Sequence, residues 1–148
     1  LPATERNEDN KDMVVDGEGR YLERTAQHYV LIIDEDDLTQ QALLPMKATQ
    51  FKKSKQWNSS IKSSKMKDGD GNLFIPARYS HVWHLTSVGE ENKNGSWHGW
   101  FIDKEGPIED VNFYREAKLF HDSIAAGQVK VKHVREEEAP SSNEDTPF

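Results

Sequence analysis

The sequence of 148 residues contains no cysteine and no long hydrophobic run. Without cysteine the chain can form no disulfide, no thiolate nucleophile and no cysteine-ligated zinc site, and this composition fits a reducing compartment. No apolar stretch approaches the roughly 18 residues of a membrane span, and no signal peptide is visible. We therefore expect a cytoplasmic protein. Because the chain begins with Leu1 rather than Met, we also expect an N-terminal part of the natural protein to be missing.

The net charge of −7 hides a strong segregation of charge along the chain. Residues 47–67 contain seven lysines and no acid, whereas residues 136–148 contain five acids and no base. A basic segment acts locally, within a Debye length of about 10 Å at 0.1 M salt. The net charge therefore does not exclude a polyanionic partner. We expect the acidic tail to compete with nucleic acid for the basic middle.

One folded domain is expected between two polar ends. Residues 1–19 are acidic and end in a glycine-containing turn, and residues 136–148 combine acids with proline and serine. Both compositions are typical of disorder. We therefore predict a disordered acidic arm at 1–19, a single α+β domain at 20–135, and a disordered acidic tail at 136–148.

Periodicity and turn residues predict the elements of the central domain. Alternating β-branched and aromatic residues mark strands, and apolar residues at a 3.6-residue period mark helices. The predicted strands are residues 21–34, 41–46, 73–88 (interrupted near Pro76), 96–103 and 128–134, and the predicted helices are residues 49–66, with Thr49 as N-cap, and 110–126. Hairpin connections predominate, so we predict an α+β fold with a mostly antiparallel sheet. A small OB-like barrel with two helices fits this order without being required by it.

The lysine-rich middle of the chain is the main candidate for a nucleic-acid site. Single-stranded nucleic acid is bound by a positive groove that follows the phosphates and by aromatic rings on which bases stack. The candidate phosphate contacts are Lys52, Lys53, Lys55, Lys62, Lys65 and Arg78, and the candidate stacking rings are Trp57, Tyr79 and Trp83. The alternatives are a solvated helix face for the lysines and a core position for each tryptophan, because large aromatics supply much of a small core.

Other motifs in the sequence do not assemble a catalytic or metal site. His81 and His84 lie three positions apart on a predicted strand and so point to opposite faces. Residues 68–72 resemble the start of a calcium loop, but Leu73 and Tyr79 stand where that loop requires glycine and glutamate. No phosphate-binding loop or nucleophile elbow is present. We therefore expect no metal, no cofactor and no enzymatic activity.

The chain ends in Asp145-Thr146-Pro147-Phe148, directly after an acidic run. Phe148 combines an apolar ring with the terminal carboxylate, so a partner can hold the ring in a pocket and the carboxylate with a basic side chain. This ending resembles the tip of bacterial and phage single-stranded DNA-binding proteins. The resemblance implies that Asp145, Pro147 and Phe148 recruit replication or repair proteins. The alternative is a frayed tail without a role.

Three segments of the core resemble a family of small tailed-bacteriophage proteins: residues 49–59, 76–81 and 97–100. The similarity extends over roughly residues 21–135, and members of the family generally carry an additional N-terminal segment. The family implies the cytoplasm of an infected bacterial host, but it defines no activity. From the tail and the basic middle we expect non-sequence-specific single-stranded DNA binding in phage DNA replication or recombination. The alternative is a protein-interaction module or an inhibitor of a host nucleic-acid enzyme, and a homo-oligomer stays open.

Overall fold

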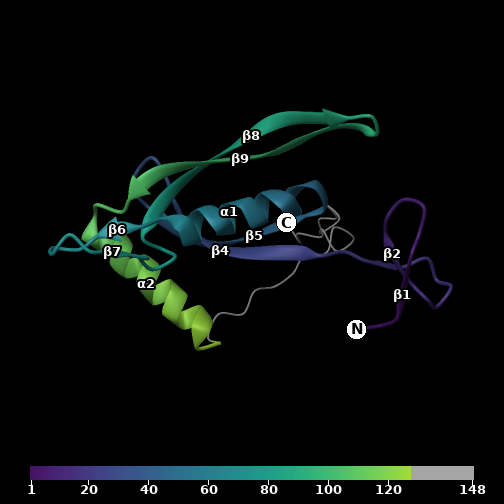
Figure 1. The fold of residues 1–148 in the computed structure, drawn as a ribbon, viewed down its shortest axis with the longest axis horizontal. Coiled ribbons are helices and arrows are strands. Elements are labelled where there is room, and N and C mark those ends of the chain that lie inside the picture. The colour runs from purple at the N-terminus through teal and green to yellow at the C-terminus, as the bar shows by residue number, and fades with distance from the viewer. Residues whose placement is uncertain (128–148) are drawn as a thin grey trace, which may run out of the picture.

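The computed structural model describes residues 1–127 and shows a mixed α/β chain built mainly from antiparallel hairpins (Figure 1). The strands are β1 (Thr4–Arg6), β2 (Asp12–Val14), β3 (Tyr21–Leu22), β4 (Thr25–Ile33), β5 (Thr39–Lys47), β6 (Met66–Lys67), β7 (Leu73–Phe74), β8 (His81–Asn92) and β9 (Gly95–Pro107). A short 3-10 helix, η1 (Ala48–Gln50), leads into α1 (Phe51–Ser63), and the second helix is α2 (Val111–Ala125). The predicted strand at 128–134 and the tail at 136–148 lie outside the described residues.

The mixed α/β class, the antiparallel pairing and the two helices are confirmed. The strands form four separate sheets, β1–β2–β3, β4–β5, β6–β7 and β8–β9. No ladder closes the strands of residues 1–127 into a barrel, so the expected OB-like barrel is not seen in this part of the chain. Thr49 is not the N-cap of α1, because Gln50 holds that position without a side-chain capping hydrogen bond. Asp110 does cap α2, and its Oδ1 accepts a 2.8 Å hydrogen bond from Asn112 N.

Residues 4–22 form the sheet β1–β2–β3, where the acidic composition predicted a disordered arm. Exposed pairs of opposite charge accompany the backbone pairing of its strands. Arg6 Nη2 of β1 lies 2.9 Å from Asp12 Oδ1 of β2, and Arg20 pairs with Asp16 in the turn before β3. A prediction based on apolar content misses such pairs. This sheet lies apart from the other elements, at the right of Figure 1.

The β4–β5 hairpin has one helix on each face. Successive residues of a strand point to opposite faces of the sheet. His28 of β4 therefore stacks on Trp57 of α1, with ring centroids 4.6 Å apart. The next residue, Tyr29, meets Phe120 of α2 edge to face, with ring centroids 6.3 Å apart. The hairpin thus fixes α1 on one side and α2 on the other.

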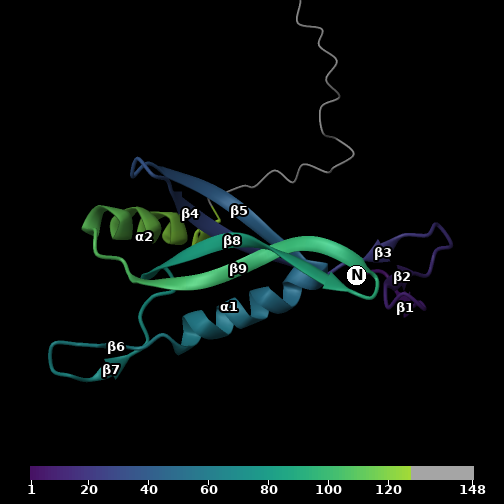
Figure 2. The same ribbon diagram turned by 90° about the horizontal axis from the view of Figure 1, so that it is seen from above.

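The long β8–β9 hairpin runs above α1 in Figure 1, and its register is interrupted once, between Val82 and Trp83. The short strands β6 and β7 follow α1 in the chain and form a two-stranded arm that projects from the molecule (Figure 2). The turn predicted at residues 68–72 joins them, and Asp68 Oδ1 accepts a 2.9 Å hydrogen bond from Asn72 N. The hairpin contacts both ends of α1, through Gln50 and Lys53 at its start and through a 2.7 Å hydrogen bond from Lys104 Nζ to Ser64 Oγ at its end, where the chain leads into the arm.

The apolar core is small and centres on α1. Within residues 1–127, the buried apolar residues are Met46, Trp57 and Phe120. Trp57 lies where three elements meet, because it stacks on His28 of β4 and contacts Trp83 of β8 edge to face at 6.2 Å. Trp57 and Ser54 mark the side of α1 that faces the core, so lysines on the opposite side of the helix face solvent.

Candidate nucleic-acid interface

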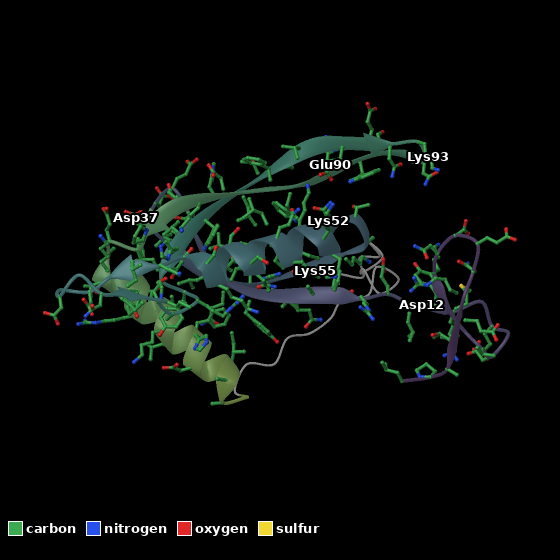
Figure 3. All side chains as sticks on the ribbon, in the orientation of Figure 1. Asp12, Asp37, Lys52, Lys55, Glu90 and Lys93 are labelled. Atoms are coloured by element: carbon green, nitrogen blue, oxygen red, sulfur yellow. The ribbon has the colours of Figure 1, made fainter. Side chains whose placement is uncertain are left out.

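Three lysines share the exposed side of α1. Ser54 and Trp57 are buried on the opposite side of the helix, so the helical period leaves Lys52, Lys55 and Lys62 exposed. At 1.5 Å rise per residue, Lys55 lies about 4.5 Å along the axis from Lys52, and Lys62 lies about 10.5 Å further. Within the described residues none of the three forms an ion pair. Figure 3 labels Lys52 and Lys55 on this helix.

Arg78 joins the same surface from the loop before β8. Its Nη2 donates a 2.7 Å hydrogen bond to Asn58 Oδ1, and Asn58 lies on α1 between Lys55 and Lys62. Arg78 itself is exposed. We call Lys52, Lys55, Lys62 and Arg78 the basic face. Lys65 is also exposed and continues the series of cations just beyond α1, at the base of the arm.

Lys53 does not belong to the basic face, although the sequence grouped it there. Its Nζ pairs with Glu90 of β8 and donates a 2.6 Å hydrogen bond to the carbonyl oxygen of Trp100 in β9. Gln50 adds two contacts, because its Oε1 accepts from Trp100 N at 2.9 Å and its Nε2 donates to Glu90 Oε2 at 3.2 Å. We call Gln50, Lys53, Glu90 and the backbone of Trp100 the clamp. It ties the start of α1 to the hairpin, so the charge of Lys53 is already compensated.

Glu90 is the acceptor at the centre of the clamp. The hydrogen bond from Lys53 lowers the pKa of the Glu90 carboxyl, and hydrogen bonds from Trp97 and Gln50 lower it further. The carboxylate reaches Gln50 by passing over Gly99 of β9. A Cβ at Gly99 would overlap Glu90 Oε2, so the clamp depends on the missing side chain at this position.

Of the predicted stacking rings, Trp57 lies in the core and is closed to a base. Its exposed fraction is 7%, and its Nε1 is buried without a hydrogen-bond partner among the described residues. Trp83 is half-buried against Trp57, with Lys104 Nζ 6.0 Å from its ring centroid. Trp57 therefore occupies a core position, which was the alternative to stacking, and Trp83 packs against it in the same aromatic cluster.

Tyr79 is held by α2 rather than by the basic face. Its ring centroid lies 5.3 Å from that of Tyr114 and 5.1 Å from that of His121. Burial raises the pKa of Tyr79, and the hydrogen bond with Tyr114 raises it further. Tyr79 and Arg78 are neighbours in the chain, but the Tyr79 side chain packs on α2 and the Arg78 side chain contacts α1.

His28 is a structural histidine. It is buried, and its Nε2 lies 2.6 Å from Ser54 Oγ of α1. Burial lowers the pKa of His28, and the nearby Arg78 charge lowers it further.

In the described part of the chain, no three histidine, cysteine, aspartate or glutamate residues are grouped to hold a metal ion. Neither α-helix within residues 1–127 is long and apolar enough to cross a bilayer.

A shallow hollow lies between the start of α1 and the β8–β9 hairpin. Its volume is about 450 Å³, and its lining includes Lys52, Lys53, Gln56, Glu90, Glu91 and Trp97. Figure 3 shows Glu90 on the side of the hairpin that faces the part of α1 labelled at Lys52. Sequence reasoning left Trp97 out of the site. The signal was present, because a hairpin turn closed by Asn92 and Gly95 sets Glu90 opposite Trp97.

The predicted partner-binding residues Asp145, Pro147 and Phe148 lie outside the described residues, so their role stays a prediction.

The fold and its lysine-bearing helix define a small mixed α/β protein with a basic face and an aromatic-lined hollow beside it. The chain belongs to the Pam3 phage gp34-like protein family, whose family model matches residues 2–130. The expected membership of a bacteriophage protein family is thereby confirmed, and the match includes the N-terminal sheet as well as the region from residue 21 over which the resemblance was expected. Comparisons with curated proteins and with solved structures gave no match.

Proposed function

We propose that this protein binds single-stranded DNA without sequence specificity, through the basic face, during phage DNA replication or recombination. The observation that carries the proposal is the exposed side of α1, where Lys52, Lys55 and Lys62 face solvent without an ion pair within residues 1–127. Arg78 adds a fourth charge to this surface. Arrays of unpaired cations are what phosphate binding requires, and phosphate contacts supply most of the non-specific affinity for nucleic acid. The proposal does not depend on the expected OB-like barrel.

The salt dependence of binding gives a quantitative test. For single strands, log affinity falls with log salt at about −0.7 per neutralised phosphate, so four cations predict a slope on the order of −3. Replacing Lys52, Lys55 and Lys62 with Gln should reduce the slope on oligo-dT by about 2. The matched control replaces three exposed lysines elsewhere, Lys11, Lys93 and Lys118, which makes the same change in net charge.

The control should leave the slope close to that of the wild type. Equal slopes for the two triple variants would remove the basic face from the binding site, since only net charge would then matter. Lys53→Gln provides a further contrast. Because Lys53 is bound in the clamp, its loss should lower the melting temperature, and with Glu90 also replaced by Gln, so that no uncompensated carboxylate remains, the salt slope should stay nearly unchanged.

The C-terminal ending extends the proposal. Asp145, Pro147 and Phe148 would recruit replication or repair proteins, with the ring and the terminal carboxylate as the contacts. The support is the sequence Asp145-Thr146-Pro147-Phe148 at the end of an acidic run.

A protein-interaction module is the second candidate, and the β6–β7 arm favours it. Three successive apolar side chains are exposed there: Leu73 by 62%, Phe74 by 44% and Ile75 by 65%. Exposed apolar patches of this kind mark interaction sites. The candidate occupant is a second copy or a host nucleic-acid enzyme. Replacing Leu73 and Ile75 with Ser and measuring sedimentation tests self-association. A monomeric wild type that nevertheless inhibits a host nuclease, without affinity for oligo-dT, would favour this candidate over DNA binding.

A further inference from the structure

We infer that the hollow between α1 and the β8–β9 hairpin takes one unpaired base, stacked on Trp97. The inference rests on the proposed function, because it names where a base lies when phosphates bind the basic face. Trp97 is half-buried and lines the hollow together with Lys52, which also belongs to the basic face. The phosphate surface and the candidate stacking ring therefore meet at Lys52.

The ring of Trp97 is held in place before any ligand binds. Its Nε1 donates a 2.7 Å hydrogen bond to Glu90 Oε2. Glu90 is itself fixed by Lys53 and Gln50 of the clamp. A fixed ring loses little conformational freedom when a base stacks on it, and stacking tolerates any base because every base has a π face.

The charges around the hollow favour a strand that passes along its edge. Glu90 is neutralised by Lys53, and the resulting ion pair contributes little net repulsion toward a phosphate. Lys52 is left with an uncompensated charge at the rim. Glu91 also lines the hollow, is exposed and forms no ion pair within residues 1–127, so it opposes phosphate. The backbone of a bound strand should therefore follow Lys52 and Lys55 rather than Glu91.

The size of the hollow and the positions of the other rings point to the same residue. A volume of about 450 Å³ lies within the range of small-ligand sites, about 300–1,000 Å³. Trp57 is closed to solvent in the core, and Tyr79 packs on α2. Phe101 of β9 is exposed by 55% but does not line the hollow. Trp97 is thus the aromatic ring that this hollow offers to a base.

The experiment compares oligo-dT with an abasic oligonucleotide of the same length, which keeps the phosphates and lacks the bases. Trp97→Ala should weaken oligo-dT binding by about 5- to 150-fold and leave abasic binding nearly unchanged. Trp97→Phe, which keeps a ring, should retain most of the affinity. Phe101→Ala is the matched control, because it removes an exposed ring from the same strand, and it should change neither affinity. Glu91→Gln should tighten both, most clearly at low salt.

Each other result has a definite meaning. Equal weakening of oligo-dT and abasic binding by Trp97→Ala would show that Trp97 acts through the clamp and would overturn the stacking role. A Phe101→Ala variant that reproduces the loss would overturn it as well. Should Trp97→Ala fail to fold, Trp97→Leu replaces it, and equal affinity of the Leu and Phe variants for oligo-dT would refute stacking. Failure of the wild type to bind either oligonucleotide would refute the proposed function itself, a result distinct from the others.

Discussion

Replacing Trp57 with Ala should lower the folding free energy and the melting temperature of the protein but leave its binding surface intact while the protein is folded. Trp57 is the apolar residue at the junction of α1, β4 and β8, where it stacks on His28 and meets Trp83 edge to face. Removing a buried Trp typically costs about 3–5 kcal/mol of folding free energy, from lost burial and from the cavity left behind. For a domain of this size, that corresponds to a fall in melting temperature of about 10–20 °C.

Trp57→Phe should cost much less than Trp57→Ala. The Nε1 of Trp57 is buried without a hydrogen-bond partner among the described residues, and an unsatisfied buried donor costs about 1–3 kcal/mol. Phenylalanine removes that donor and keeps a ring against His28. The gain offsets part of the lost indole volume, so we expect a change of no more than about 1.5 kcal/mol.

Thermal melts followed by circular dichroism, together with oligo-dT titrations below the transition, measure both effects. Trp57→Ala should melt early and, while folded, bind oligo-dT within a factor of about three of the wild type, well below the 1–3 kcal/mol per base expected from lost stacking. Trp97→Ala should show the opposite behaviour, with a large loss of binding and a smaller loss of stability. A Trp57→Ala variant that melts normally and binds weakly would refute the assignment of Trp57 to the core.

Three further predictions concern the clamp, the buried histidine and the tail. Gly99→Ala should lower the melting temperature by displacing the Glu90 carboxylate and the Gln50 amide, and in a Glu90→Ala background, where only the Gln50 overlap remains, the same substitution should cost less; fully additive losses would refute the contact with Glu90. Because burial first and Arg78 second depress the pKa of His28, the unfolded state binds protons more readily below pH about 6.5, so stability should fall as pH drops below that value. A His28→Gln variant with an equally steep urea-denaturation profile between pH 7 and 5 would contradict this. Deleting Phe148 should leave oligo-dT affinity unchanged and abolish capture of a replication or repair enzyme, and equal capture by both proteins would rule out a docking tip.

Local sequence patterns were sufficient to predict both helices and the existence of both long hairpins, but the predicted strand at 73–88 is in fact two strands, β7 and β8, and the pairing of β7 with β6 was not predicted. The helical period around Trp57 and the stop at Gly127 locate α1 and α2 to within a few residues. The β-branched run of β4 and the turn at residues 92–95 locate the hairpins. These elements are specified by neighbours in the chain. The N-terminal sheet is different, because its strands are short and acidic, and composition records neither their backbone pairing nor the charge pairs, such as Arg6 with Asp12, that accompany it.

The candidate site was only partly predictable, because the direction of each side chain depends on tertiary packing. Lys52 and Lys53 are adjacent in a lysine-rich segment, and only the position of Glu90 shows that one is paired and the other is not. Trp57 and Trp97 are likewise equivalent by composition. The helical period of Trp57 with Ile61 did indicate the core. The turn at residues 92–95 sets Trp97 opposite Glu90, but only the tertiary contact of Glu90 with Lys53 and Gln50 places Trp97 beside the basic face.

The exposed lysines of α1 are easier to explain by binding than by stability. Lys52 and Lys55 lie about one turn apart, and like charges at this spacing destabilise an isolated helix by a few tenths of a kcal/mol. No acid on α1 relieves this repulsion, so the helix relies on the buried Trp57 and on the clamp at Gln50. A phosphate backbone would neutralise the repelling charges and add stability only in the bound state. Lys53 obtains the same neutralisation from Glu90 within the free protein. The contrast between these lysines supports assigning phosphate contacts to the basic face and a structural role to the clamp.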